Sequence, residues 1–181
     1  MDILEIIYNR RTVHSYADAK VPQDILLSGL RAAIHAPNHK LTYPWRFFIL
    51  GPQSRESVAN VQIQLKRKKQ EMTDVAAQAL KDKFLNAGEL LLVGIVKSDN
   101  PVQMKEDYAA LSAGLQNMAL FLWQKGYGTK WSTGGMIQHP ELKNLVPSDI
   151  EVCGVFWIGR PRVIPPVTPR PPVEQFVSHL P

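Results

Sequence analysis

The chain has 181 residues, of which 45% are hydrophobic and 20% are charged. This length fits one domain with a substantial core, because a chain of this size buries roughly 70% of the surface that its unfolded form exposes. The composition excludes a disordered chain, and no apolar run reaches the roughly 18–20 residues of a membrane span. The 21 basic and 16 acidic residues give a net charge of +5, which favours anionic partners such as nucleotides, cofactor phosphates or nucleic acid.

The N-terminus and the cysteine content predict a cytoplasmic protein. The segment MDILEIIYNRR has an acid at position 2 and its basic pair after the apolar residues, the reverse of a secretory signal peptide. Cys153 is the only cysteine, so no disulfide can form within the chain. Its setting, EVCGVFWIG, indicates a buried strand and not an activated thiol.

Two helices are predicted in the first part of the chain. Asp2 and Glu5 form a capping pair ahead of an apolar stripe, so the first helix is expected to end near Arg10. The second helix is signalled by Pro22 at a first-turn position, and it must stop before Pro37.

The middle of the chain predicts two strands that flank a long helical region. Residues 45–50 (WRFFIL) are closed by a Gly-Pro pair, and residues 90–96 (LLLVGIV) form the continuous apolar run of a buried strand. A polar helical region runs between them from about residue 54 to residue 85. Thr73 and Asp74 predict a break there with a new N-cap.

Residues 108–125 form the strongest predicted helix. It is apolar almost all round and is expected to be buried, with small residues that let a sheet approach one side and another helix the other. A glycine in GYG caps its end. A strand at about 129–132, a brief helix from Pro140 and a last strand at 151–158 follow. Residues 160–181 form an extended Pro-rich tail, whose apolar side chains favour contact with another surface.

Several signatures of nucleotide binding and catalysis are absent from the sequence. There is no GxxxxGK[ST] loop, and GYG follows a helix instead of joining a strand to one, so it is no Rossmann turn. There is no HEXXH, no zinc pattern among the histidines and no GxSxG elbow. The densest charge, residues 64–70 (QLKRKKQ), has no interleaved aromatic residues. A solvated helix face is therefore favoured there over a nucleic-acid site.

The segment RRTVHSY, residues 10–16, places two arginines and a hydroxyl residue where the first helix is expected to end. Two interpretations are open. Exposed arginines at a helix C-terminus complement the helix dipole and contribute less than about 1 kcal/mol. Alternatively, the arginines bind a phosphate, for which each charge-assisted bond is worth roughly 1.5–3 kcal/mol.

Five segments, in their order and spacing, resemble the nitroreductase family of FMN-dependent oxidoreductases, above all its short members. They are RRTVHSY, AAIHAPNHKLTYPWRFFIL, the small-residue helix that ends in GYGTKW, the turn WSTGG, and IGRP before the Pro-rich tail. The most specific pair is the APxH…PW segment together with the initial RR[ST]. The resemblance covers nearly the whole chain.

The resemblance implies an α+β fold of the α/β/α three-layer type, with a mixed central sheet flanked by helices. It implies a single domain over residues 1–181 and an intertwined homodimer that binds FMN at the subunit interface. NADH or NADPH would deliver a hydride to flavin N5, and a small-molecule oxidant such as a nitroaromatic or a quinone would take the electrons in a ping-pong cycle. No catalytic acid is required, because the flavin carries the chemistry. Neither a nucleic acid nor a membrane is expected as a partner.

The resemblance also implies which residues hold FMN. Arg10 and Arg11 match positions that meet the phosphate and the polar edge of the ring, and Thr12 adds a hydroxyl and a backbone N–H. The remaining matches come from the segment that reaches the partner's flavin, from the turn beside the ring and from the tail: His35, His39, Trp131, Ser132, Thr133, Gly134 and Arg170. Each histidine could instead be an ordinary surface or core residue, and Trp131 could belong to the core.

Two positions depart from the family pattern. His14 stands where members commonly carry Arg or Lys, and Tyr43 stands where Asn or Gln often precedes PW. The reduction potential and the substrate range are therefore left open, as is a wall or lid formed by residues 54–85. Two other functions also stay open. One is a flavoenzyme of the same fold that performs dehydrogenation or flavin breakdown, and the other is a non-enzymatic module that binds polyanions through Lys66 to Lys69.

Overall fold

The computed structural model describes residues 2–181 and is built around one four-stranded sheet. Its strands are β1 (Trp45–Ile49), β2 (Glu89–Val96), β3 (Gly128–Ser132) and β4 (Ile150–Gly159), in the order β1-β2-β4-β3. Every neighbouring pair runs antiparallel. The expected mixed sheet is thus corrected to an antiparallel one. Outside the named strands, a parallel pairing occurs in the described residues as the isolated bridge between Thr12 and Thr129.

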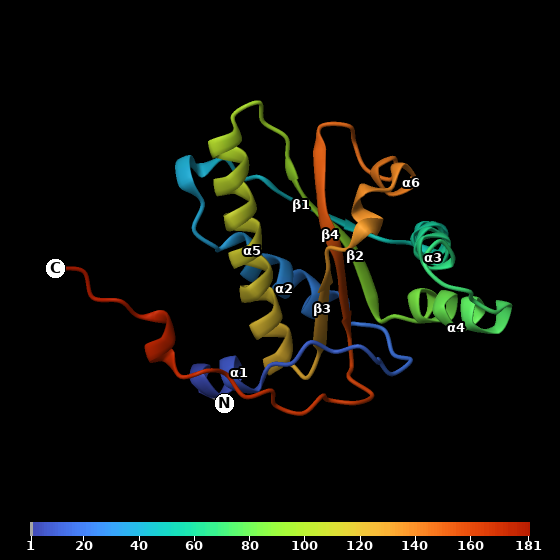
Figure 1. The fold of residues 1–181 in the computed structure, drawn as a ribbon, viewed down its shortest axis with the longest axis horizontal. Helices are drawn as coiled ribbons and strands as arrows, with labels where there is room; N and C mark the ends of the chain where they lie inside the picture. The colour runs from blue at the N-terminus through green and yellow to red at the C-terminus, as the bar shows by residue number, and fades with distance from the viewer. Residues whose placement is uncertain (1) are drawn as a thin grey trace.

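Helices cover both faces of the sheet, as the three-layer prediction requires (Figure 1). On one face lie α2 (Gln23–Ile34) and α5 (Pro101–Gln124), and on the other lie α3 (Pro52–Arg67), α4 (Asp74–Leu85) and the short α6 (Pro140–Lys143). Alternate residues of β2 serve the two cores, since Leu91 and Val93 pack toward α5 while Leu90 and Leu92 pack toward α3 and α4. This explains the continuous apolar run of that strand.

The N-terminal helices form where the sequence predicts them. Helix α1 (Ile3–Asn9) starts with a complete capping box between Asp2 and Glu5 and ends just before Arg10. Helix α2 ends at Ile34, ahead of Pro37, although Pro22 is its N-cap and not part of its first turn.

Helices α2 and α5 approach each other closely because small residues lie between them. A Cβ on Gly114 would come within 2.6 Å of the Ala33 carbonyl oxygen, so only glycine fits at this crossing. Helix α5 begins earlier than predicted, with the Asn100 side chain accepting from the amides of Val102 and Gln103. Its burial is one-sided in a single chain: Tyr108 on its outer side is 43% exposed.

The polar region splits into α3 and α4 at the predicted place. The Thr73 side chain accepts from the amide of Ala76 and caps α4. The guanidinium of Arg55, in the first turn of α3, links the segments before α3 and after α4 to the sheet. It donates to the carbonyl oxygens of Leu50 and Ala87, and it pairs with Glu89 at the start of β2 at 3.0 Å. This half-buried network fixes the position of α4 relative to β2.

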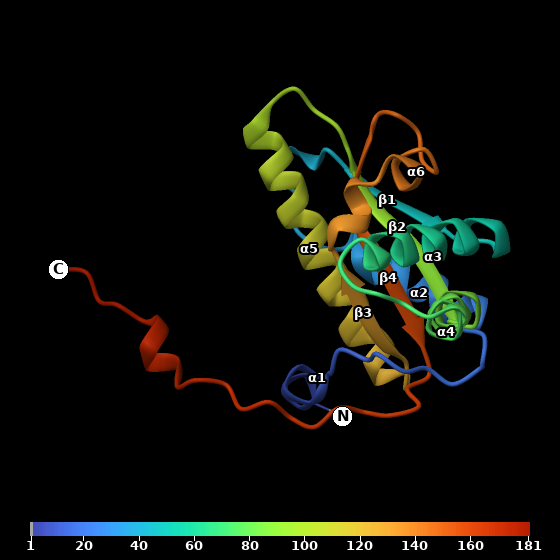
Figure 2. The same cartoon turned by 45° about the vertical axis from the view of Figure 1, so that its right-hand side comes forward.

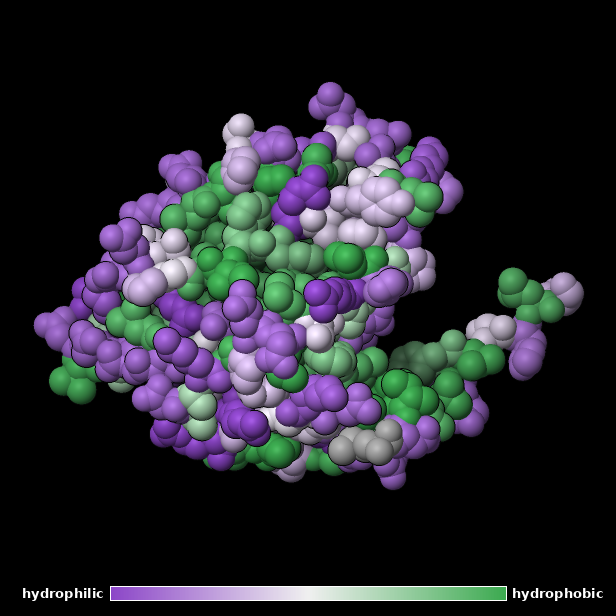
Figure 3. Space-filling view, turned by 180° about the vertical axis from the view of Figure 1, so that it is seen from behind, coloured by the Kyte–Doolittle hydropathy of each residue, from purple (hydrophilic) through white to green (hydrophobic). Residues whose placement is uncertain are grey.

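Short 3-10 segments join the main elements at His39–Leu41, Gly135–Gln138 and Val173–Phe176. The last of these belongs to the tail, which leaves the body after a bridge between Tyr16 and Pro161 and projects away from it (Figures 1 and 2). Its apolar residues are exposed, with Val167 at 65% and Phe176 at 73%. Seen from behind, apolar surface also lies in the middle of the face and along the tail (Figure 3). No helix among residues 2–181 is long and apolar enough to cross a membrane.

Candidate functional site

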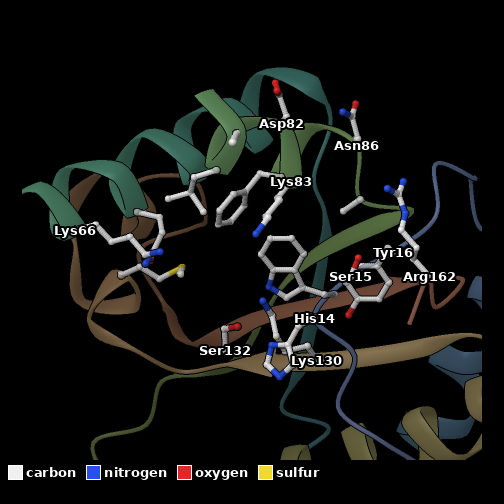
Figure 4. A pocket seen from close by; sticks show the side chains of 17 residues that line it. His14, Ser15, Tyr16, Lys66, Asp82, Lys83, Asn86, Lys130, Ser132 and Arg162 are labelled. Carbon is white, nitrogen blue, oxygen red and sulfur yellow. The ribbon is translucent and has the colours of Figure 1, made fainter. Parts of the chain in front are cut away.

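The largest cavity lies at the β3 and β4 side of the sheet, beneath α4 (Figure 4). It has a volume of about 610 Å³. Its walls come from the loop after Arg10, from α3 and α4, and from both strands. The arrangement gives a half-open space that is wide enough for a drug-sized ligand. We call this space the main cavity.

Cations dominate the charge of the main cavity. Five basic side chains line it, each from a different part of the chain: His14, Lys66, Lys83, Lys130 and Arg162. The one carboxylate in the lining is Asp82, and its Oδ1 already accepts from the side-chain amide of Gln78 at 2.8 Å. A ligand of this cavity is therefore expected to carry negative charge or to expose electronegative oxygen atoms.

Lys130 is the most enclosed of these cations. Its Nζ lies 4.0 Å from the centroid of the Trp157 ring, within cation–π distance. Burial lowers the pKa of Lys130 to about 8, and the positive charges of Lys83 and Lys66 add to this effect. The side chain thus changes its charge near neutral pH when the cavity holds no anion.

Trp157 lines the main cavity with its ring, while its Nε1 is buried inside the protein. The residue is 5% exposed, and its Nε1 has no hydrogen-bond partner among the described residues. Tyr16 stacks parallel to it at a centroid distance of 6.4 Å, and Phe84 packs against it at 4.5 Å. A buried N–H without an acceptor costs about 1–3 kcal/mol, so this indole group lowers the stability of the fold locally.

A second, smaller pocket of about 240 Å³ lies on the α5 face of the sheet, across the edge strand β3 from the main cavity, and Lys130 borders both. Arg10, Thr12 and Trp131 line the second pocket together with side chains of α5. Its position is fixed by the loop after α1, because the amide of Val13 donates to the Thr129 carbonyl at 3.0 Å and ties this loop to β3. We call this space the Arg10 pocket.

Three guanidinium groups gather at the Arg10 pocket. Burial lowers the pKa of Arg10, and the charges of Arg11 and Arg170 lower it further, which places all three in one electrostatic cluster. None of the ion pairs among residues 2–181 involves any of them. Arg11 also donates from Nη1 to the carbonyl oxygens of Tyr8 and Arg10, so its group caps the end of α1. The cluster is suited to an anion, with Arg10 as its half-buried member.

The residues at the predicted turn after β3 do not all line the same cavity: Trp131 lines the Arg10 pocket and Ser132 lines the main cavity. The Trp131 ring packs beside Tyr108 of α5 at a centroid distance of 6.0 Å, and its Nε1 donates to the Cys153 carbonyl of β4 at 3.2 Å. Thr133 and Gly134 are exposed. A Cβ on Gly134 would meet no protein atom within 4 Å, so only a ligand could make a glycine necessary there.

The two predicted histidines lie apart from both cavities. His35 is the C-cap of α2 and His39 begins the next 3-10 segment; both are exposed and neither lines the main cavity or the Arg10 pocket. In a single chain the structure thus separates them from the other predicted site residues. Only a second copy could bring them to a cavity.

The sequence interpretation missed several residues of the main cavity. Lys130 and Trp157 were read as parts of motifs or of a buried strand, and Lys83 and Arg162 were not singled out. The sequence did contain a signal for Lys130. Side chains alternate between the two faces along the strand GTKWS, so Lys130 is predicted on the face opposite to Trp131. Trp157 was not detectable, since its neighbours in the sequence are as apolar as those of any core strand.

Neither the cysteine nor a metal-binding cluster adds a reactive group to these cavities in the described residues. Cys153 is 4% exposed, and burial, followed by the charge of Glu151, raises the pKa of its thiol to about 11. The prediction of a buried, inert thiol is confirmed. Among residues 2–181 no cluster of three or more His, Cys, Asp or Glu side chains could hold a metal ion.

Comparison with known proteins gives a consistent result. The sequence model of the nitroreductase family matches residues 7–160. YfhC of Bacillus subtilis, provisionally named an NAD(P)H nitroreductase, is 28% identical over 180 residues, which cover 97% of this chain and 93% of that protein. The crystal structure of a nitroreductase-like family protein from Bacillus cereus superposes with a TM-score of 0.86 at 26% identity and covers 99% of this chain and 96% of that one. A nitroreductase structure from Desulfovibrio desulfuricans, described as a complex with FMN, shares the fold with a TM-score of 0.75 at 21% identity and covers 100% and 98% of the two chains.

Proposed function

Because this chain belongs to the nitroreductase family, we propose that it is an oxidoreductase that binds FMN across the Arg10 pocket and the main cavity. The observation that carries the proposal is a cluster of three guanidinium groups that have no carboxylate partner among the described residues, close to a large cationic cavity. FMN consists of a phosphate dianion joined by a ribityl chain to a flat, oxygen-bearing ring. The Arg10 pocket and the main cavity lie on either side of the edge strand β3, and they match these two parts in charge and in relative size.

The residues present fit such a cofactor. Arg10 would pair with the phosphate, with Arg170 adding a second cation and Thr12 a hydroxyl at the same pocket. The ring would lie in the main cavity, beside His14, Ser132 and the Trp157 ring. Arg11 contributes charge from the rim, since its own hydrogen bonds go to the end of α1.

The bound flavin would accept a hydride from NADH or NADPH at N5 and pass the electrons to an electron-poor acceptor such as a nitroaromatic or a quinone, in a ping-pong cycle. The side chains described above would bind and orient the cofactor and would neutralise its negative charge. The half-open main cavity leaves one side accessible to donor and acceptor in turn. A reducing compartment that supplies nicotinamide cofactors, the cytoplasm, suits this activity.

We further propose that the working unit is an intertwined homodimer. Apolar side chains on α1, α2 and α5 and along the tail are exposed in the single chain, for example Leu4 at 51%, Leu27 at 40% and Phe176 at 73%. Exposed apolar side chains that are grouped in this way commonly mark a protein–protein interface. A second copy would cover them and would bring His35 and His39 to its partner's cavities.

The proposal is tested by the spectrum of freshly purified protein and by anaerobic reduction. We expect a yellow protein whose flavin bleaches when NADH or NADPH is added without oxygen and recovers its colour with a nitroaromatic or a quinone. A flavin that binds but is not reduced by either nicotinamide would favour another reaction of the same fold. A colourless protein that takes up no FMN in excess, and instead binds polyanions in a salt-sensitive way, would favour the non-enzymatic alternative.

A further inference from the structure

We propose that the main cavity favours electron acceptors that carry a negatively charged group, and that Lys66 and Lys83 bind this group. The inference rests on the proposed function, because it takes the flavin ring to lie in the main cavity, and it names the substrate class of that site. Such an acceptor is a nitroaromatic or a quinone with a carboxylate on its ring. The reacting group and the charged group are then separate parts of one molecule.

Lys66 and Lys83 come from the two helices that cover the main cavity. Lys66 lies in the last turn of α3 and Lys83 in the last turn of α4, and both line the cavity. Figure 4 shows them on the helical side of the space, whereas His14 and Ser132 lie on the side of the strands. A flavin ring beside His14 and Ser132 would leave the two lysines facing the remaining space.

Neither of these ammonium groups has a carboxylate partner among the described residues, although other cations of the same helices do. On α3, Arg67 pairs with Asp74 at 2.6 Å, and on α4, Lys81 pairs with Glu56. None of these four residues lines the main cavity. The ion pairs of the two helices therefore lie outside the cavity, and the cations inside it are available to a ligand.

The bound cofactor would not neutralise the main cavity by itself. Its phosphate would bind in the Arg10 pocket, across the edge strand β3, and the oxidised ring has no net charge. Asp82, the one carboxylate in the lining, already accepts from a side-chain amide. The positive charges of Lys83 and Lys66 also lower the pKa of Lys130, so three ammonium groups repel one another in one space. An anionic group on the substrate would relieve this repulsion.

The closeness of the two lysines to Lys130 favours the acceptor over the nicotinamide donor as the source of the anion. Their charges act on the pKa of Lys130, and such an interaction weakens with distance, so they lie near the strand side where the ring would bind. A carboxylate on the acceptor lies only about one aromatic ring away from the reacting group. The extra phosphate of NADPH is on the adenosine, at the far end of the molecule from the nicotinamide.

The carboxylate takes no part in the reaction itself. When para-nitrobenzoate is the acceptor, its nitro group takes up two electrons and two protons, loses one water molecule and becomes a nitroso group. Both electrons and one proton arrive as a hydride from the reduced flavin, and solvent supplies the second proton. Lys66 and Lys83 therefore act on binding, and their removal should raise the apparent KM and leave kcat almost unchanged.

The test compares para-nitrobenzoate with para-nitrobenzamide, which has nearly the same shape and no charge. Lys66→Met and Lys83→Met should each lower the ratio of their kcat/KM values, benzoate over benzamide, by about threefold relative to the wild type. The double variant should lower it by about tenfold. Comparing ratios between variants cancels the different intrinsic reactivities of the two acceptors. Lys66→Arg should keep the wild-type ratio, and added salt should reduce the preference of the wild type.

Lys68→Met is the matched control. It removes an exposed charge of the same sign from the end of α3, outside the cavity lining, and should leave the ratio unchanged. Binding to the oxidised, FMN-loaded protein without a donor, followed by the change in the flavin absorption spectrum, gives a second measurement that needs no turnover. The double variant should bind para-nitrobenzoate about tenfold more weakly and para-nitrobenzamide as tightly as the wild type.

The outcomes separate this inference from the proposed function. A wild-type protein that binds no FMN refutes the proposed function, and the inference with it. If all variants bind FMN and neither the kcat/KM ratio nor the binding of para-nitrobenzoate changes, the proposed function stands and the selection of anionic acceptors is wrong. Variants that alter only the preference between NADPH and NADH would also overturn the inference, because they would assign the two lysines to the donor.

Discussion

At the scale of single residues, Arg10 is the side chain that we expect to bind the cofactor phosphate. It is the half-buried member of the three-guanidinium cluster, and it lines the pocket next to Thr12. Arg11, which was predicted to share this role, spends two of its donors on the end of α1. We therefore expect the two adjacent arginines to differ in function, although nothing in the sequence distinguishes them.

We expect Arg10→Ala to weaken FMN binding by about 10- to 150-fold, which corresponds to the loss of about 1.5–3 kcal/mol from one charge-assisted contact. The fold should persist, because the side chain makes no ion pair in the described structure. Fluorescence titration with FMN and thermal denaturation measure the two effects. Arg31→Ala, which removes an exposed charge from α2, is the control and should bind FMN normally. A full flavin complement in Arg10→Ala would refute the phosphate site.

The pKa of Lys130 predicts a pH dependence of the stability of the flavin-free protein. Its pKa is about 8 in the folded chain, below the ordinary lysine value of 10.5. Between these two pH values the unfolded chain binds more protons than the folded one, so stability rises with pH over this window. Lys130→Met removes the burden of the buried charge at lower pH. We therefore expect the variant to gain most over the wild type below pH 8, and the gain to shrink as the pH rises toward 10.5.

Urea unfolding of both proteins at several pH values measures this difference. The comparison cancels groups that titrate in both proteins, such as the Cys153 thiol. A gain that stays constant from pH 7 to pH 10.5 would show that Lys130 has an ordinary pKa in the folded chain.

At the scale of secondary-structure elements, the loop between α2 and β1 stores backbone strain. Lys40, Leu41 and Tyr43 all have positive φ angles, at 57°, 51° and 47°, which residues other than glycine rarely adopt. Asp107 of α5, only 2% exposed, holds this loop: its Oδ1 accepts from the Thr42 hydroxyl. Leu41 and Tyr43 are exposed by this arrangement, at 65% and 59%. Strain of this kind persists where the surroundings enforce it, commonly at functional segments.

We expect Asp107→Ala to lower the free energy of unfolding by about 1–3 kcal/mol, because it leaves the Thr42 hydroxyl without its buried acceptor. Chemical denaturation measures the change. Asp99→Ala, at an exposed position before α5, is the control and should change stability by less than about 0.5 kcal/mol. An Asp107→Ala variant as stable as the control would show that the loop holds its conformation without the carboxylate.

At the scale of the whole molecule, the tail is the feature that favours association with a second copy of the chain. It projects from the body and exposes its valines and Phe176 (Figure 2). It is nevertheless anchored where it starts, because the amide of Arg162 donates to the Ser15 carbonyl at 2.9 Å beside the Tyr16–Pro161 bridge. An anchored, apolar and extended segment suits a contact with a second copy of the chain.

A chain that ends at Arg162 should lose the dimer and remain folded, because the removed segment adds no residue to either core. Sedimentation over a range of concentrations measures the association, and circular dichroism checks the fold. The removed segment includes Arg170, so a full-length Arg170→Ala variant is needed as the control; it should bind FMN less tightly but stay dimeric. A truncated protein that dimerises like the full-length chain would show that α1, α2 and α5 suffice.

The sequence by itself determined the elements and the family. Capping residues, prolines and apolar periodicity are local, so the ends of α1 and α2, the N-cap and end of α4, and the buried strand β2 could be predicted from neighbouring residues. The motifs likewise led to the FMN hypothesis, and the family match confirmed the relationship.

Only the tertiary structure decided which side chains share a space. Lys130 and Trp157 are far apart in the sequence, and their pairing depends on the register between β3 and β4. Strand direction also depends on long-range pairing, which explains why the mixed sheet was predicted wrongly. Burial, which lowers the pKa of Lys130 and leaves Trp157 without an acceptor, is a property of the packed chain and has no local signature in the sequence.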